Sequence, residues 1–267
     1  MYEKLLEKLK QNQPLIHCIT NPIAIHQSAN AVLALGARPI MAEHPEEVSE
    51  ITGTAQGLLM NLGNITDVRM ESMKRSFETA REEKLPVVLD AVGVACSTLR
   101  RRFVQELLEA GAPTVIKGNY SEILALHRLE YRSSGVDADR SLTTDSVTAA
   151  AVSLAEKYHT LILASGKTDI VTDGKRVVYV HNGSARLSTV TGTGCMLGAI
   201  CTCCIALESS LDAVVKACTI LGICGERAKT EKGSGSFMVN LMDALSLIND
   251  KDIEDCQKVE EQKYGGI

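Results

Sequence analysis

The sequence has no tryptophan, and only three phenylalanines and six tyrosines occur among its 267 residues. Because single-stranded nucleic acids are commonly bound by stacking bases on aromatic side chains, this scarcity argues against such a surface. The net charge points the same way, since 33 acidic residues outnumber 28 basic ones. A net charge of −5 gives no overall attraction to phosphate backbones or anionic membranes. We therefore expect small-molecule partners, no nucleic acid and no membrane.

Long apolar runs and linkers are also missing. No apolar run reaches the roughly 18 residues that a membrane-spanning helix needs. There are only six prolines, and we find no internal repeat, low-complexity tract or Pro/Gly/Ser-rich linker. A chain of this length and 45% apolar content can bury a substantial core, so we expect a single domain over residues 1–267.

Disulfide pairing is not expected. Nine cysteines is an odd number, and residues 1–10 have the pattern of a charged amphipathic helix rather than a secretory signal. We therefore expect reduced thiols and a cytoplasmic location. Cys201, Cys203 and Cys204 fall within one apolar helical segment, where their side chains point to different sides. Their expected role is packing rather than metal binding.

Short apolar runs alternate with segments of helical periodicity, which is typical of an α/β fold. The order indicates a mostly parallel sheet followed by a hairpin, whose Asp173-Gly174 turn fits type I′. From Cys195 to about Glu260 we expect helices only. Expected strands are 15–19, 57–61, 86–90, 113–117 and 161–164; expected caps are Thr66 or Asp67, Ser97, Asn119 with Glu122, Ser210 and Ser236; residues 130–144 are expected to form a surface loop.

The most informative stretch is 188–204, STVTGTGCMLGAICTCC. Small residues around Gly192, Thr193 and Gly194 precede an apolar helix expected to begin near Cys195. The first amides of a helix have no partner within it, and the helix dipole makes its start attractive to anions. With glycines allowing close approach, this stretch predicts a phosphate-binding helix start.

Polar residues follow the apolar runs where each strand should end. In an open parallel sheet these ends share one edge, which is where ligands bind. A carboxylate, a cation, amides and hydroxyls there suit phosphoryl transfer, which depends on positioning and charge neutralisation. The sequence has neither GxxxxGK[ST] nor GxGxxG to explain phosphate binding otherwise. The residues at this edge are Asn21, Met41, Asn61, Gly63, Asp90, Lys117, Asn119, Ser165 and Gly166.

Several segments together resemble the hydroxyethylthiazole kinase family of the ribokinase-like superfamily. They are the segment HCITNPIAIHQSANAVLALGARPIMAEHPEEV, DAVG at 90–93, IKGNYSEI at 116–123 and TVTGTGC at 189–195. The match extends from about Pro14 to Phe237, and its motifs are specific in combination. The resemblance implies a ribokinase-like three-layer α/β/α fold with a mostly parallel sheet and no separate lid domain.

The same resemblance implies an enzyme that uses ATP and Mg²⁺ to phosphorylate the primary alcohol of 4-methyl-5-(2-hydroxyethyl)thiazole, a step of thiamine salvage. It further implies a homotrimer with active sites at subunit boundaries. By position, Asp90 and Glu122 match magnesium-associated carboxylates, although Glu122 is equally explained as the glutamate of a capping box. Lys117 and Ser165 match residues near the ATP phosphates and the nucleotide, with Asn119 beside them.

The alcohol-binding residues implied by the resemblance are Met41, Gly192, Asn21, Ile23 and Gly63. Gly192, Thr193 and Gly194 would hold phosphate at the helix start. Cys195 stands where related kinases carry an aspartate that accepts the alcohol proton. The helix dipole lowers the pKa of a thiol there, and a triphosphate raises it, so we expect a weak base that mainly positions the alcohol.

Two positions depart from the family pattern, since His26 and Ser28 stand where Asn and Thr are expected. The first alternative is therefore a kinase for another small alcohol, such as hydroxymethylpyrimidine, or an ATP-dependent hydrate dehydratase. A second is a non-catalytic small-molecule sensor on the same fold. A nicotinamide-dependent oxidoreductase is more distant, because the early glycine fingerprint is lacking.

Overall fold

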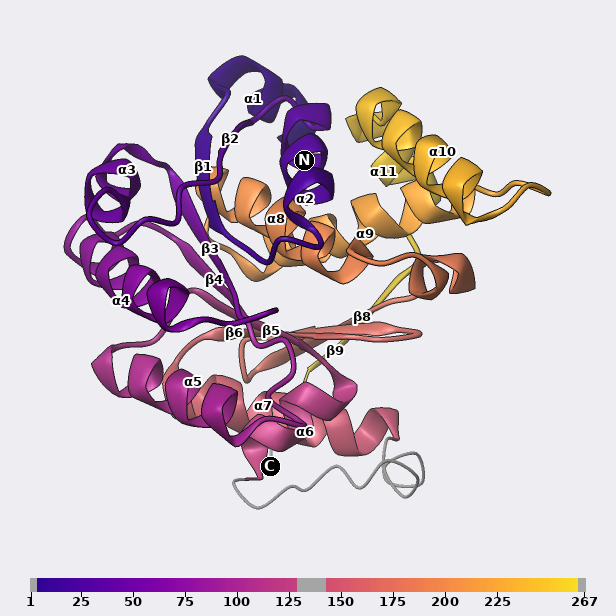
Figure 1. The fold of residues 1–267 in the computed structure, drawn as a ribbon. Coiled ribbons are helices and arrows are strands. Elements are labelled where there is room, and N and C mark those ends of the chain that lie inside the picture. Colours follow the sequence, from indigo (N-terminus) through magenta and orange to yellow (C-terminus); the bar gives the residue numbers. More distant parts are fainter. Residues whose placement is uncertain (1–3, 129–142, 264–267) are drawn as a thin grey trace.

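In the computed structural model, residues 4–128 and 143–263 are described, and they form helices on both faces of one sheet (Figure 1). The sheet order is β2-β1-β3-β4-β5-β6-β7-β8-β9. Strands β1 to β6 run parallel to one another. Strand β7 pairs antiparallel with β6, β8 with β7, and β9 with β8. The strands are β1 (Leu15–Ile19), β2 (Arg38–Ile40), β3 (Gly57–Asn61), β4 (Val87–Asp90), β5 (Val115–Asn119), β6 (Leu161–Ser165), β7 (Asp169–Thr172), β8 (Arg176–Val180) and β9 (Val259–Lys263).

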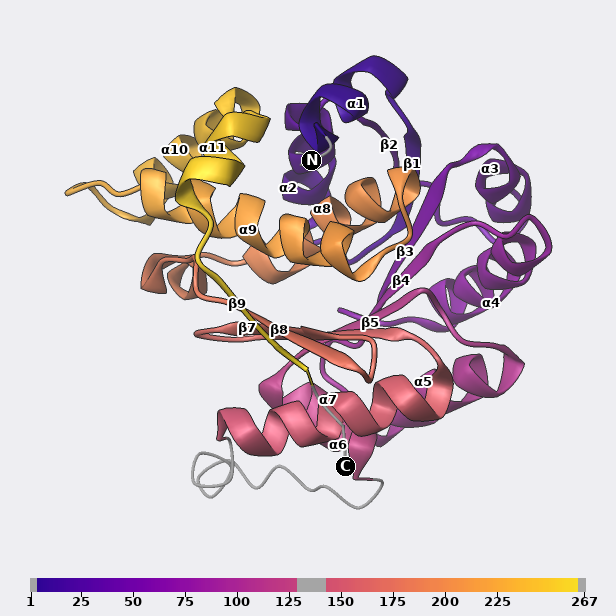
Figure 2. The same ribbon diagram turned by 180° about the vertical axis from the view of Figure 1, so that it is seen from behind.

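The helices form the two outer layers. Figures 1 and 2 agree that α1, α2, α8, α9, α10 and α11 cover one face of the sheet and α3 to α7 cover the other. Their bounds are α1 (Leu5–Asn12), α2 (Ile25–Ala34), α3 (Val48–Thr54), α4 (Asp67–Glu82), α5 (Thr98–Ala110), α6 (Tyr120–His127), α7 (Thr144–Tyr158), α8 (Thr193–Leu207), α9 (Leu211–Arg227), α10 (Ser234–Leu247) and α11 (Asp250–Cys256), with a short 3₁₀ helix η2 (Ala185–Thr189) before α8.

Alternation along the strands divides the core between the two faces. On β3, Leu59 belongs to the cluster under α8, while Leu58 and Met60 belong to the cluster under α4. Side chains of a strand point to opposite faces in turn, so both faces of a buried strand must be apolar. This accounts for the unbroken apolar runs that mark the parallel strands in the sequence. The predicted three-layer α/β architecture with a mostly parallel sheet is confirmed, and the described residues contain no separate lid domain.

Side-chain caps define several helix starts as the sequence predicted. Thr66, Ser97 and Ser210 each accept a backbone N–H at the start of α4, α5 and α9. Asn119 and Glu122 form a complete capping box at α6. Such a cap contributes about 1 kcal/mol, because it satisfies an amide that the helix leaves unpaired.

Other predictions were wrong in detail. Ser236 does not cap α10, which begins two residues earlier after Gly233. The helical segment ends at Cys256, and the strand β9 follows it. The hairpin turn is not type I′, because Gly174 has a φ of +92° but Asp173 is not among the residues with positive φ. The predicted loop at 130–142 lies outside the described residues.

Nowhere in the described ranges does a helix combine the length and the apolar character needed to cross a membrane.

Candidate functional site

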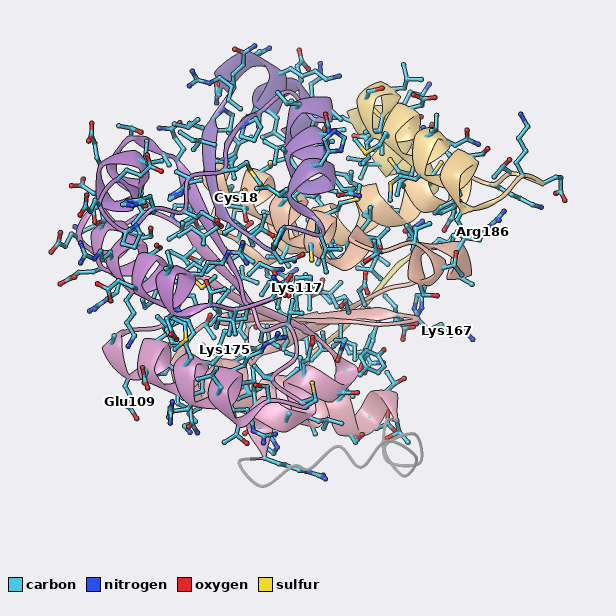
Figure 3. All side chains as sticks on the ribbon, viewed as in Figure 1. Cys18, Glu109, Lys117, Lys167, Lys175 and Arg186 are labelled. Carbon is cyan, nitrogen blue, oxygen red and sulfur yellow. The ribbon has the colours of Figure 1, made fainter. Side chains whose placement is uncertain are left out.

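Three neighbouring strands place polar side chains in one row near their carboxyl ends. Asn61 on β3 pairs in register with Asp90 on β4, and Asp90 pairs with Lys117 on β5. Because residues in register on neighbouring strands project to the same face, these three side chains meet. All three side chains are buried, although they are polar and the strand residues before them are apolar. Figure 3 shows Lys117 near the middle of the molecule, between the sheet and α8.

Asp90 is the centre of this row. Its Oδ1 accepts from Lys117 Nζ at 2.9 Å, and its Oδ2 accepts from Asn61 Nδ2 at 2.7 Å. Burial raises the pKa of the Asp90 carboxyl, an effect that the Lys117 charge and both hydrogen bonds oppose. Burial acts to lower the pKa of Lys117, but the Asp90 carboxylate outweighs it and the pKa of the ammonium is raised. We infer an ion pair, since each charge has a close partner and each Asp90 oxygen accepts a hydrogen bond.

The start of α8 lies directly above this pair. Gly192, the N-cap, has a φ of +90°, which favours glycine, and no side chain caps the helix. A Cβ on Gly198 would lie 3.4 Å from Asp90 Oδ2, so glycine there lets α8 pack close to the carboxylate. Thr193 Oγ1 donates to Leu187 O at 2.7 Å and ties η2 to the helix start. The helix begins at Thr193, two residues before the predicted Cys195.

Two amides converge on the sulfur of Cys195. Asn21 Nδ2 lies 3.2 Å and Asn61 Nδ2 lies 3.4 Å from Cys195 Sγ. Asn21 is itself held in place, because its Oδ1 accepts from Ala24 N and its Nδ2 also donates to Asn61 Oδ1. The Gly63 amide donates to Asn61 Oδ1 at 2.9 Å. One hydrogen-bonded cluster therefore joins the start of α8 to the strand ends.

The pKa of Cys195 depends on more than the helix dipole. Burial, and next the Asp90 charge, raise the pKa of the Cys195 thiol, and the Lys117 charge and the two amides only partly oppose this. Because the pKa is raised, the thiol form predominates at neutral pH, and the thiolate forms only as the pH rises above the ordinary range for cysteine. A role as a base at neutral pH is disfavoured.

The raised pKa of the Cys195 thiol predicts slow alkylation of this residue. At pH 7 iodoacetamide should label Cys195 several-fold more slowly than free cysteine, and the rate should still be rising at pH 9, because only the thiolate reacts. Peptide mapping by mass spectrometry measures the rate at this residue separately from the others. Rapid labelling at pH 7 that stays level as the pH rises would show a thiolate instead.

A cavity of about 660 Å³ lies next to the cluster, within the range of small-molecule sites. Its walls come from the ends of β6 and β8, from the start of α8 and from α9. Lys167 belongs to its lining, and Figure 3 shows this residue at the same side of the molecule as Arg186 of η2. The lining includes Ser165, Gly166, Asp169, His181, Asn182, Gly183, Thr193, Gly194, Cys218 and Leu221.

The predicted site residues fall into three groups. Ser165, Thr193 and Gly194 line the cavity. Asn21, Gly63, Asp90, Lys117 and Cys195 belong to the hydrogen-bonded cluster, with Gly192 at the N-cap above it. The others lie outside both sets: Asn119 and Glu122 cap α6, Met41 packs partly buried against the core beyond β2, and Ile23 is 61% exposed.

Asn61 is the member of the cluster whose role the sequence did not reveal. It was placed only at a strand end, yet its amide contacts Asp90, Asn21, Cys195 and Gly63 together. A local signal does exist, since Asn61, Asp90 and Lys117 each come directly after a run of apolar residues within a strand. Without the register of those strands, however, their meeting cannot be derived.

Comparison with known proteins identifies the family of the chain. The model of the hydroxyethylthiazole kinase family matches residues 6–251. "Hydroxyethylthiazole kinase 2" of Clostridium botulinum strain Hall is 42% identical over 252 residues, covering 92% of this chain and 95% of that protein.

Solved structures show the same fold. The hydroxyethylthiazole kinase protein of Pyrococcus horikoshii OT3 has a TM-score of 0.88 at 35% identity, covering 97% of this chain and 98% of that one. A ribokinase-like superfamily protein of Enterococcus faecalis V583 has a TM-score of 0.64 at 13% identity, with 90% and 93% covered, which supports the ribokinase-like fold alone. With this fold, this cluster and a family match over nearly its whole length, the chain belongs to the hydroxyethylthiazole kinase family.

Proposed function

We propose that this protein transfers the γ-phosphoryl group of ATP to the primary alcohol of 4-methyl-5-(2-hydroxyethyl)thiazole. The observation that carries the proposal is the uncapped start of α8, which lies between a cavity of nucleotide size and the buried Asp90–Lys117 pair. Phosphoryl transfer through a loose transition state needs charge neutralisation and alignment, and this arrangement offers both.

Each predicted residue receives a role in this proposal. The amides at Gly192, Thr193 and Gly194 receive the transferring phosphate, because they lie at the positive end of α8. Lys117, Ser165 and Asn119 are assigned to the nucleotide in this proposal, and of the three Ser165 lines the cavity. Met41, Asn21, Ile23, Gly63 and Gly192 enclose the thiazole alcohol. The alcohol oxygen forms the new bond to the γ-phosphorus, the bond from that phosphorus to the β-phosphate oxygen breaks and releases ADP, and the alcohol proton passes late to a phosphate oxygen.

The carboxylates of the site fit a magnesium ion. Both oxygens of Glu122 accept backbone amides, from Gly93 and Asn119 at 2.7 Å each, and every carboxylate oxygen keeps a further lone pair. Burial, followed by the Asp90 charge, raises the pKa of Glu122, so the two carboxylates act on each other. The described residues contain no cluster of three or more His, Cys, Asp or Glu that would enclose a metal.

Mg²⁺ keeps several waters and uses one or two carboxylates with substrate phosphates, which suits Asp90 and Glu122. When bound, it would neutralise phosphate charge. We further propose a single domain that assembles as a homotrimer, in which exposed Ile23 of one protomer reaches a neighbouring site. All nine cysteines are free, which suits the reducing cytoplasm.

The direct test is ADP release from ATP with magnesium and the thiazole alcohol, compared with the hydroxymethylpyrimidine alcohol. We expect turnover with the thiazole alcohol at a kcat/KM at least tenfold higher than with the pyrimidine. A preference for the pyrimidine would assign the other kinase activity. Nucleotide binding without turnover on either alcohol would favour the sensor.

Cys195→Ser should lower kcat about tenfold and leave the KM for ATP within twofold. The serine hydroxyl can accept the two amides but is smaller than the thiol, so the alcohol is held less well. Steady-state kinetics with each substrate varied in turn measures both constants. An unchanged kcat would remove Cys195 from the mechanism, and a large rise in the ATP KM would place it with the nucleotide instead.

A further inference from the structure

The cavity contains a carboxylate that the predicted site does not use. Asp169, at the start of β7, accepts from the Gly166 amide at 3.0 Å through Oδ1, and it also hydrogen-bonds the Cys218 thiol. Gly166 follows β6 and Cys218 belongs to α9, and all three residues line the cavity. The carboxylate therefore lies in the cavity wall where these two elements meet.

No lysine, arginine or histidine within residues 4–128 and 143–263 forms an ion pair with Asp169. Burial raises the pKa of Asp169 to about 6, and the hydrogen bond from Gly166 opposes the rise. At pH 7 the group is therefore mainly ionised, and an ionised carboxylate only accepts hydrogen bonds. A ligand that fills the cavity displaces water from the Asp169 carboxylate. Unless the ligand offers the carboxylate a hydrogen-bond donor in place of that water, its binding is weakened.

The cavity lining offers two kinds of contact. Thr193 and Gly194 present the start of α8, which attracts phosphate. Phosphate oxygens are anionic acceptors, so they cannot satisfy a carboxylate. The nucleoside part of ATP has neutral donors, namely the ribose hydroxyls and the amino group of the base. The carboxylate is therefore complementary to the nucleoside part of ATP and not to its phosphates.

We propose that Asp169 is a specificity-determining residue that accepts a hydrogen bond from a neutral donor of the nucleoside part of ATP. The proposal rests on the proposed function, because it takes the cavity to be the nucleotide site. A hydrogen bond between a neutral donor and a charged acceptor contributes about 10- to 100-fold to binding affinity. Removing either the Asp169 carboxylate or the nucleoside donor should weaken binding by that factor. Removing both should weaken binding by the same factor and not by its square.

Calorimetric titration of the full-length protein with Mg²⁺ and ADP, 2′-deoxy-ADP, 3′-deoxy-ADP or IDP tests the contact without turnover. Wild type should bind at least one analogue about tenfold or more weakly than ADP, and the analogue affected identifies a ribose hydroxyl or the base amino group. Asp169→Ala should bind ADP about tenfold more weakly and show no discrimination against that same analogue.

Two further variants separate this contact from a role in folding. Asp169→Asn keeps an acceptor for the Gly166 amide and should retain part of the discrimination. Asp173→Asn is the matched control, because Asp173 likewise accepts backbone amides, from Lys175 and Arg176, but lies outside the cavity lining. Its affinities for all four diphosphates should equal those of wild type. A merely structural Asp169 would change all four affinities by one common factor.

Equal binding of all four diphosphates by wild type, or unchanged discrimination in Asp169→Ala, would overturn the proposal while leaving the nucleotide site in place. A folded wild-type protein that binds none of the four would overturn the proposed ATP-dependent function as well.

Discussion

Gly194→Val should lower kcat/KM for ATP by at least 100-fold in a protein that is folded as well as wild type. A Cβ at Gly194 would meet no protein atom within 4 Å, so the fold has room for the new side chain. Valine is also no worse than glycine within a helix. The added methyl groups occupy the space in front of the first amides of α8. Losing one such donor to a transition state typically reduces the rate 100- to 1000-fold.

Gly235 offers a matched control. It is the second residue of α10, as Gly194 is of α8, and a Cβ there also meets nothing within 4 Å. Gly235→Val should therefore keep wild-type kinetics and wild-type thermal stability. Steady-state kinetics and calorimetric melting of both variants make the comparison. Wild-type turnover in Gly194→Val would show that phosphate does not approach this helix start.

Much of the fold was predictable because its signals are local. The residues of β1 and β3 were predicted without error, since uninterrupted apolar runs ended by polar residues mark buried parallel strands. The caps at Ser97 and at Asn119 were equally clear, because a cap needs only residues within one turn. Gly192 and Gly194 likewise identified the helix start from the chain alone.

The errors arose where distant contacts outweigh local pattern. Leu99 shares a helical spacing with the buried Phe103 and Leu107, which predicts that it faces inward, yet it is 41% exposed. The strand β9 is exposed throughout and mostly charged, so its sequence shows no alternation of apolar and polar residues. It forms by pairing with β8, and Arg176 joins Glu261 across that pair at 2.9 Å. Such pairing depends on where the chain returns in space, which the local sequence does not encode.

The same limit applies to the site. Asp90 and Lys117 were recognised as candidates separately, but their ion pair follows from the register of β4 against β5. The raised pKa of Cys195 depends on burial and on Asp90, and neither effect can be read from the helix start alone. No local pattern identifies Asp169, because the cavity that it lines is completed by residues of α9.

Lys117→Met should destabilise the protein by about 3–5 kcal/mol at pH 8, because it leaves the fully buried Asp90 carboxylate without its ion-pair partner. Methionine fills a volume close to that of the lysine stem, so lost packing contributes little. Denaturant unfolding followed by far-ultraviolet circular dichroism measures the effect. The variant should also lose ATP turnover by at least 100-fold, since the cation beside the transferring phosphate is removed.

The pH dependence of this loss has a definite sign. Burial already raises the pKa of Asp90, and removing Lys117 removes an effect that opposes the rise. An acid whose pKa is higher in the folded than in the unfolded state favours folding most when it is protonated, and stability falls as pH rises through the interval between the two values. The deficit of Lys117→Met relative to wild type should therefore shrink as the pH is lowered from 8 to 5.

The double variant Asp90→Asn with Lys117→Met separates stability from catalysis. It contains no buried charge at either position, and the amide oxygen introduced at position 90 can still accept from Asn61, so most of the lost stability should return. Activity should not return, because neither the cation nor the carboxylate is present, and kcat/KM should stay at least 1000-fold below wild type. If Lys117→Met were as stable as wild type at pH 8, Asp90 would be protonated in the native protein and the ion pair would not exist. If the double variant regained activity together with stability, the pair would serve folding alone.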